Sequence, residues 1–348
     1  MSQLLTYGDI TPVQAAWVTV KMLERGMPLL QLEKFGQTYT LPTNQTNVAK
    51  FRRYFLTGAT GAAGNGSGSF YIPVATTPLT EGVTPSGSKL TNQDYTCTLR
   101  QYGDFVALTD VVLDVHTDPI MATATEVLGE QAAVTIETLR FNVLKAGTNV
   151  FYGGNVGGRS SVVTAITRED QRRVTAALNR QNARKITSVV ASSAAFNTKS
   201  VEAAYMAVCH PDVENDIRNM TGFKPVADYG PHSSPFEGEI GSVEQVRYLA
   251  STVIAPWADT GGTAVTNNLK FTTANTAADI YPVLYFGRDA FGMVPLKGKT
   301  ALTPMVVNPK PTQGDPLGQR GSVGWKAWNG SVILQDAWMA RLEVGVTA

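Results

Sequence analysis

The chain has 348 residues, with 29 Lys and Arg against 28 Asp and Glu, so its formal net charge is +1. This balance excludes a nucleic-acid binder that works through a cationic face, and a hydrophobic share of 43% excludes a disordered chain. Only 16% of the residues are charged, which indicates that much of the folded surface is not exposed to water.

The beginning of the chain lacks the features of a targeting sequence. The first basic residue is Lys21. A signal peptide consists of a basic segment followed by an apolar segment, and the start of this chain has neither. No apolar run reaches the roughly 18 residues of a membrane span. We therefore expect a protein that is made and folded in a cytoplasm and has no membrane partner. Residues 9–12 predict the start of a helix that ends at Gly26.

Residues 49–115 predict a long two-stranded arm. The first strand, 49–56, interleaves Arg52 and Arg53 with aromatic residues. The stretch 57–69 contains five glycines and no charged residue, which favours a flexible tip. Strand-like residues return at 70–74, a turn-rich tract follows at 78–91, and a second strand is predicted over 95–115. A lone two-stranded arm is marginal in water, so this one needs a surface to lie on.

Residues 118–146 predict the longest helix, which Asp118 and Pro119 open and Gly147 ends. Apolar residues recur every three or four positions on one face, which predicts that Leu128 and Leu139 are buried. At ~1.5 Å per residue the helix spans about 43 Å and would act as a spine. The acidic residues expected on the opposite face are Glu126, Glu130 and Glu137.

The rest of the chain alternates short elements, so the fold class is α+β. A capped helix is predicted from 167 to about 182, and a mixture of short strands and helices over 186–255. Residues 256–280 predict an exposed insertion, and residues 281–286 a strand. Asn329 and Gly330, between two strand-like segments, predict a hairpin with a type I′ turn.

No motif in the chain predicts a catalytic, cofactor or metal site. Cys97 and Cys209 lack metal-ligand spacing and are expected to be buried thiols. Cys209 and His210 are neighbours on a predicted strand, so their side chains diverge rather than form a catalytic pair. The glycines of 64–68 lack the strand and helix that flank a phosphate-binding loop. Glu237 and Glu239 lie on a glycine-punctuated turn, where we expect them to be solvated or to contact a partner.

Ten short sequence strings, taken in their order, resemble those of tailed-phage major capsid proteins of the Hong Kong 97-like fold. They are similar to strings in the coat-protein family typified by N-four-like podophages, and the likeness spans nearly the whole chain. The strings are LEKFG at 32–36, KFRRY at 50–54, LTEGVTP at 79–85, QYGDF at 101–105, TD at 109–110, GEQ at 129–131, HPDV at 210–213, EGEIG at 237–241, DPLGQRG at 315–321 and VGWK at 323–326.

The resemblance implies a four-part organisation of the chain. An N-terminal arm would occupy 1–48 and an extended loop 49–115. A peripheral domain, built on the spine helix 118–146, would comprise 116–185 and 310–348. A mixed α/β axial domain would comprise 186–309.

The resemblance also implies a structural role rather than an enzyme. The subunit would assemble into hexamers and pentamers of an icosahedral shell in the host cytoplasm and end in the virion, around double-stranded DNA that it does not bind sequence-specifically. Glu126, Glu130 and Glu137 would face this DNA. The extended-loop residues that would contact a neighbouring subunit are Arg52, Arg53, Gly64, Gly66, Phe70, Tyr71 and Ile72. Only about 48 residues precede the loop, so we expect a separate scaffolding protein, besides a portal and a possible decoration protein. The loop tip 57–69 has no Lys, which predicts non-covalent locking. Two other functions remain open at this point, an unrecognised α/β enzyme and a tail or adhesin-type module.

Overall fold

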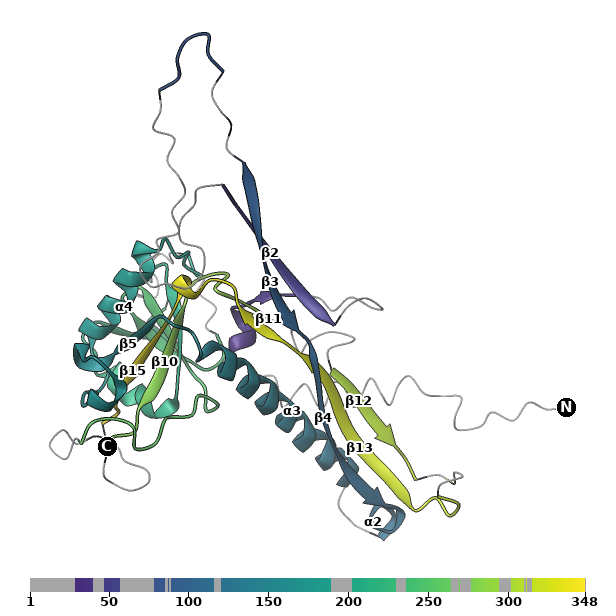
Figure 1. The fold of residues 1–348 in the computed structure, drawn as a ribbon. Coiled ribbons are helices and arrows are strands. Elements are labelled where there is room, and N and C mark those ends of the chain that lie inside the picture. The colour runs from purple at the N-terminus through teal and green to yellow at the C-terminus, as the bar shows by residue number, and fades with distance from the viewer. Residues whose placement is uncertain are drawn as a thin grey trace, which may run out of the picture.

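The structure is a computed structural model in which the chain folds into an elongated unit, a compact unit and a projecting hairpin (Figure 1). The residues that it describes are 29–39, 47–56, 78–84, 87, 89–115, 120–188, 202–229, 236–263, 269, 277–293, 302–309, 311 and 315–347. The expected N-terminal helix, Asp118, and the arm residues Gly64, Gly66, Phe70, Tyr71 and Ile72 lie outside these ranges.

The elongated unit is a sheet covered on one face by a single long helix, α3 (Ile120–Leu144). Its antiparallel strands are ordered β12 (Leu302–Val307), β13 (Arg320–Asn329) and β4 (Arg100–Thr109). Alternate residues of β13, including Val323 and Trp325, pack against Leu128 and Ile136 of the helix. This alternation is what a sheet with one covered face requires. The short helix α2 (Asp110–Val115) follows β4.

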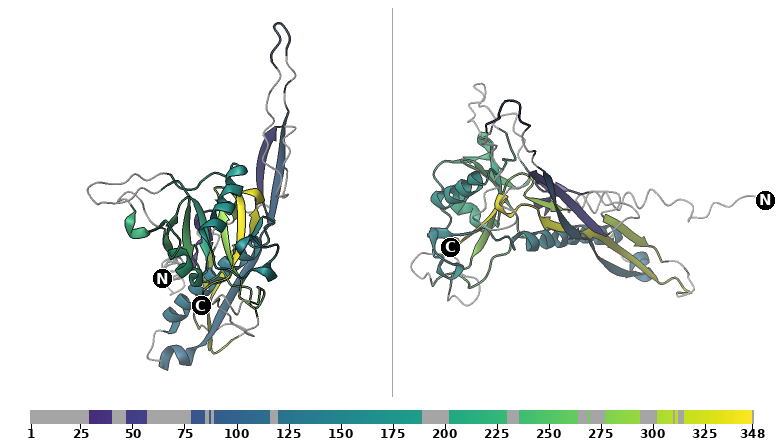
Figure 2. Two further views of the ribbon diagram at one scale, coloured as in Figure 1. Left: turned by 90° about the vertical axis from the view of Figure 1, so that its left-hand side faces the viewer. Right: turned by 45° about the horizontal axis from the view of Figure 1, so that its top comes forward.

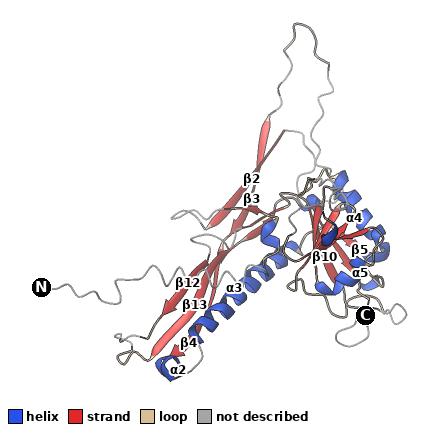
Figure 3. Ribbon diagram, turned by 180° about the vertical axis from the view of Figure 1, so that it is seen from behind, coloured by secondary structure: helices blue, strands red, loops and turns tan. Residues whose placement is uncertain are grey.

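The compact unit is built around one mixed sheet of seven strands, with α4 (Arg168–Arg180) and α5 (Glu214–Arg218) on one face (Figure 3). On β10, Tyr281, Val283 and Tyr285 face these helices, whereas Leu284 and Phe286 point to the opposite face. The strands in sheet order are β5 (Val150–Tyr152), β15 (Met339–Val344), β10 (Tyr281–Phe286), β6 (Tyr205–Cys209), β9 (Val246–Ala250), β8 (Glu239–Val243) and β7 (Phe223–Pro225).

A small sheet of three strands lies between the two units: β1 (Gln37–Thr38), β11 (Phe291–Met293) and β14 (Ser331–Ile333). The single-turn 3₁₀ helices are η3 (Leu32–Lys34), η4 (Gly153–Asn155), η5 (Arg159–Ser161), η7 (Pro211–Val213), η8 (Val226–Asp228) and η9 (Asp336–Trp338).

The projecting hairpin pairs β2 (Val48–Leu56) with β3 (Leu90–Thr98), and Figure 2 shows it reaching beyond the compact unit. On its inner side, Ala49, Phe51 and Cys97 are buried in a small cluster. This cluster fixes the base of the hairpin to the body of the protein. The predicted arm was too long, because the chain turns after Thr98 and β4 pairs with β13 of the elongated unit.

The predicted hairpin at Asn329–Gly330 is wrong. β13 ends at Asn329 and pairs with β4 and β12, whereas β14 begins at Ser331 and pairs with β11. The chain therefore crosses between two sheets at Gly330. A Cβ atom on Gly330 would lie 2.6 Å from the Cys97 sulfur and 2.8 Å from a methyl carbon of Leu99. The glycine serves close packing against β3 rather than a turn.

The expected boundary between the peripheral and axial domains divides a single sheet. β5 and β15 were assigned to the peripheral part, yet they hydrogen-bond into the sheet that contains β10. The helix α4 packs on the same sheet. The expected insertion 256–280 is also partly internal, because Leu269 is buried. The compact unit thus extends beyond residues 186–309 at both ends.

The spine helix is close to its predicted bounds, but its buried face rotates along its length. Leu128 is only 3% exposed, as expected, whereas Leu139 is half-buried. The reason is that Phe141 and Leu144 face the compact unit, while Leu128 and Ile136 face the three-stranded sheet.

Replacing Leu128 by alanine should lower the free energy of unfolding by about 2–5 kcal/mol, because it empties a site in the core between helix and sheet. The neighbouring Val127 is 51% exposed, so Val127→Ala is the matched control and should cost well under 1 kcal/mol. Urea unfolding of the unassembled subunit measures both values. Equal losses for the two variants would show that the assigned face is wrong.

Candidate assembly surface

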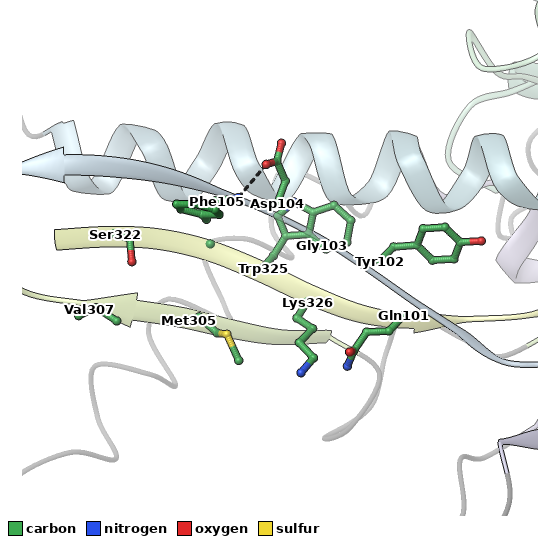
Figure 4. A pocket seen from close by; sticks show the side chains of 11 residues that line it. Gln101, Tyr102, Gly103, Asp104, Phe105, Met305, Val307, Ser322, Trp325 and Lys326 are labelled. Carbon is green, nitrogen blue, oxygen red and sulfur yellow. Dashed lines mark hydrogen bonds between the residues drawn. The ribbon is translucent and has the colours of Figure 1, made fainter. Parts of the chain in front are cut away.

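The outer face of the three-stranded sheet carries exposed apolar side chains, and none of the residues that the structure describes covers them. Met305, Gly324 and Phe105 form one cross-strand row on this face. The side chains of Phe105, Met305 and Val307 are 68%, 48% and 56% exposed. A surface hollow of about 590 Å³ runs along them, and its polar lining includes Lys326 (Figure 4). A cluster of exposed large apolar side chains is a candidate surface for contact with another protein.

Two glycines on this outer face leave the backbone without side-chain cover. A Cβ atom on Gly324 would lie 2.8 Å from the Cβ of Phe105, and one on Gly103 would lie 2.5 Å from the carbonyl oxygen of Trp325. Side chains at these positions would collide with the sheet itself. The glycines therefore leave the backbone of β4 and β13 accessible to close approach by a partner.

The opposite face of the same sheet is tied to the spine by hydrogen bonds as well as by apolar packing. Gln131 of α3 donates to Asp104 at 2.6 Å and accepts from the indole N–H of Trp325 at 3.1 Å. This bridge fixes the sheet against the helix, so the outer face is presented on a rigid support.

Two of the residues expected to contact a neighbour, Arg52 and Arg53, are among those that the structure describes. They lie on opposite faces of the hairpin. Arg52 is on the outer side, where it makes a bidentate ion pair with Asp94 at 2.7 and 3.0 Å. Arg53 is half-buried, lies over the ring of Trp338 at 5.2 Å and donates to Gln335. Arg53 thus connects the hairpin to its own body, and Arg52 remains available at the surface.

The expected acidic stripe on the spine is broken at Glu137. Glu126 and Glu130 are partly exposed, but Glu137 is 1% exposed. The prediction that Glu137 faces the inside of a shell is therefore wrong. The rotation of the buried face carries it under the segment 29–34, where its Oε1 atom accepts from the backbone N–H groups of Gln31 at 3.0 Å and Leu32 at 2.7 Å.

Glu137 belongs to a buried group of charges between α3 and η3. Arg140, also 1% exposed, lies 3.8 Å from Glu137 and 3.0 Å from Glu33. Burial raises the pKa of Glu137 to about 7, against the smaller opposing effects of Arg140 and the two backbone N–H groups. Burial also lowers the pKa of Lys34, on the same turn.

The remaining motifs serve packing and capping. Glu239 was expected to be solvated or to contact a partner; instead it is buried and makes two 2.6 Å hydrogen bonds with Arg247. The His210 ring accepts from the backbone N–H of Asp212 and caps η7. Burial raises the pKa of Cys209, which disfavours a reactive thiolate. Arg172 of α4 pairs with Glu244.

Within the described ranges, no three His, Cys, Asp or Glu side chains gather as metal ligands would. In the same part of the chain, no helix has the length and apolar character needed to span a bilayer.

The outer-face residues Phe105, Met305 and Val307 were not singled out from the sequence. A signal was present, because β4 carries Phe105 among Tyr102, Val106 and Leu108, so apolar side chains lie on both faces of the strand. Apolar side chains on both faces of a strand favour cover on both sides, so this pattern predicts a partner on the outer face.

Comparison with known proteins identifies the family. The model of a family described as "Phage capsid protein" matches residues 94–342, more than half of the chain. The chain belongs to this phage capsid protein family.

A related sequence agrees with this family. The "Major capsid protein" of Pseudomonas phage KPP21 is 22% identical over 262 residues, which is 70% of this capsid protein and 66% of the relative. The match therefore spans slightly less than two thirds of the relative's own length.

Solved structures show that this capsid protein has the Hong Kong 97-like fold. The capsid of Ralstonia phage GP4 is similar with a TM-score of 0.61 at 14% identity, covering 90% of this chain and 87% of that one. The capsid of cyanophage Pam1 is similar with a TM-score of 0.56 at 15% identity, covering 100% and 97%. An encapsulin from Synechococcus elongatus is also similar, with a TM-score of 0.52 at 10% identity, covering 100% and 93%.

Glu137 should make the stability of the capsid subunit depend on pH. Because its pKa is raised from 4.5 to about 7, folding favours the protonated carboxyl. The protonated Glu137 carboxyl therefore makes its full contribution to the free energy of unfolding below pH 4.5, and this contribution is lost as the pH rises through about 7. The shift corresponds to about 3 kcal/mol. Glu137→Gln keeps the acceptor oxygen and removes the charge, so the variant should be more stable relative to the wild type at pH 8 than at pH 5.

Urea unfolding at the two pH values measures this difference. Glu130→Gln, at a partly exposed position of the same helix, is the matched control and should follow the wild type. A Glu137→Gln variant whose stability changes with pH in parallel with the wild type would contradict the assignment.

Proposed function

We propose that the chain is the major capsid subunit of a tailed phage. It assembles into hexamers and pentamers that form an icosahedral shell around a double-stranded DNA genome. The observation that carries the proposal is the outer face of the three-stranded sheet, where exposed apolar side chains lie beside Gly103 and Gly324 and no described residue covers them. Family membership supports a shell as the structure that covers it.

The proposed domains follow the two units rather than the boundaries expected from sequence. The unit of α3 with β4, β12 and β13 corresponds to the peripheral domain, and the seven-stranded unit to the axial domain. Residues 1–48 form the N-terminal arm. The hairpin of β2 and β3 is the base of the extended loop, and it lies across a neighbouring subunit. Arg52 on its outer side, together with Gly64, Gly66, Phe70, Tyr71 and Ile72, contributes to that contact.

The proposed relation to the genome is non-specific. A net charge of +1 provides no excess of cations for tight binding to phosphates. Glu126 and Glu130 face the interior, where like-charge repulsion within about 8–10 Å keeps the packaged DNA from adhering. The other proposed partners are a separate scaffolding protein, a portal and a decoration protein. The subunit is synthesised in the bacterial cytoplasm and has no enzymatic activity.

Assembly tests the proposal directly. The subunit, expressed with and without a scaffolding protein from the same phage, should form closed hollow particles in negative-stain electron microscopy. Val307→Asp should abolish these particles, because it places a charge on the apolar outer face, while the unfolding midpoint of the subunit stays the same. Val307→Thr, which keeps the shape of the side chain, is the control and should assemble. Discrete small oligomers with a ligand-protectable pocket would instead favour an enzyme, and stable trimers a tail or adhesin-type module.

The lock between subunits should be non-covalent. The stretch 57–69 contains no Lys to form an isopeptide bond with a neighbour. Denaturing electrophoresis of mature particles should therefore give one band at the mass of the subunit. A ladder of linked subunits would refute this prediction.

A further inference from the structure

Residues 29–34 run along the spine helix α3 in the same direction as the helix itself. Leu30 belongs to the apolar cluster that contains Ile136, and Leu32 belongs to the next cluster along the helix, which contains Leu144. Residue numbers therefore rise together in the segment and in the helix. Residues 1–28, which lie outside the described ranges, are thereby directed toward the earlier turns of α3.

One hydrogen bond fixes the register of this segment on the helix. The backbone N–H of Leu32 donates to the Oε1 atom of Glu137 at 2.7 Å, and the two residues are 105 positions apart in the chain. The helix predicted over residues 9–26 advances about 1.5 Å per residue, as α3 does. Two parallel helices with the same rise keep a constant offset, so an offset close to 105 continues back from this contact.

Charges of opposite sign face each other at this offset. Lys21 and Arg25 are the two basic residues of the predicted helix. An offset of 105 places Lys21 opposite Glu126, and it places Arg25 opposite Glu130. The two cations and the two acids are each spaced by about one helical turn, so a single register satisfies both pairs. Both glutamates are partly exposed, so a second helix can reach them.

The apolar cluster between α3 and the three-stranded sheet has partly buried members beside these acids. Ile120 and Met121 of α3 and Val306 of β12 pack against the cluster but are only partly buried. A further apolar element would remove their remaining surface from water, which is favourable. The predicted helix has the side chains for this contact. Those that share one face are Trp17, Val20 and Leu23.

We propose that residues 9–26 form a helix that packs parallel to α3 of the same subunit. Lys21 pairs with Glu126, Arg25 pairs with Glu130, and the apolar face around Val20 covers the edge of the cluster. The inference goes beyond the proposed function, because this contact lies within one subunit and exists before a shell forms. The pairing makes this part of the spine neutral rather than acidic, and a neutral surface likewise offers packaged DNA no cations to bind.

The occupant is the same chain because the end of the N-terminal segment is already seated on α3. Leu30 is 2% exposed and Leu32 is 1% exposed. Only a short connection separates these anchored residues from the end of the predicted helix at Gly26. A short connection costs little loop-closure entropy, so the chain's own helix reaches the site at a high effective concentration.

Charge reversal with rescue tests the contact. In the unassembled subunit, Glu130→Lys and Arg25→Glu should each raise the rate of amide hydrogen exchange over residues 12–25 about tenfold or more, because each puts like charges face to face. The variant that combines both changes should restore most of the protection. Glu202→Lys reverses an exposed acid away from α3 and is the matched control, which should exchange like the wild type.

The exchange results decide the contact without reference to assembly. Residues 12–25 that exchange in the wild type at the rate of an unfolded peptide would overturn the proposal. So would single variants that exchange like the wild type, or a combined variant that fails to recover. Because Glu130 is partly exposed, the unfolding midpoint of Glu130→Lys should stay close to that of the wild type. In each of these cases the proposed capsid function stands, since it is tested by the formation of shells.

A disulfide identifies the chain that supplies the helix. The native thiols Cys97 and Cys209 are buried, so Arg25→Cys with Glu130→Cys supplies two reactive thiols. Oxidation of the unassembled double variant with diamide should form a bond within one chain, which denatures to a compact loop that migrates faster on a non-reducing gel. Arg25→Cys with Glu202→Cys should form no such bond. Disulfide-linked dimers, or no link at all, in the first variant would overturn the proposal.

Discussion

The structure depends on one long helix that buries its side chains against two different sheets. In its first half, Leu128 and Ile136 of α3 pack on Val323 and Trp325 of the three-stranded sheet. In its last turns, Phe141 and Leu144 pack beneath the seven-stranded sheet. A single rigid rod thus holds both units, because a helix cannot bend sharply without a break in its hydrogen bonds. The sheet face turned away from the helix is the one that we propose for assembly.

Buried ion pairs fix the orientation of the elements that meet around this rod. Glu137 and Arg140 hold the segment 29–34 on the helix. Within the compact unit, Glu343 is fully buried and pairs with Arg159 at 2.6 Å and Arg341 at 2.8 Å. Such pairs contribute little net stability, because desolvation offsets their attraction, but a misplaced partner leaves a buried charge uncompensated. They favour one arrangement of the units over alternatives, a property that a subunit needs if it is to repeat in a shell.

The same fold occurs at 10–15% identity in phage capsids and in an encapsulin. What these proteins share is a pattern of burial, which many sequences satisfy. The surfaces between subunits are less constrained by the fold.

The sequence by itself determined the local elements and the family. The spine helix, the strand at 281–286, the helix that Thr167 caps and the burial of Leu128 follow from periodicity and end signals, which act over a few residues. Ordered strings along the chain indicated the capsid fold.

Tertiary structure alone decided which strands pair. Asn329 and Gly330 have the local signature of a hairpin, yet β13 and β14 join different sheets because packing against Cys97 and Leu99 outweighs the preference for a turn. Glu137 likewise reads as a surface acid, and it is buried because the helix turns a second face toward the compact unit. Both outcomes depend on contacts between residues that lie far apart in the chain, which no local pattern encodes.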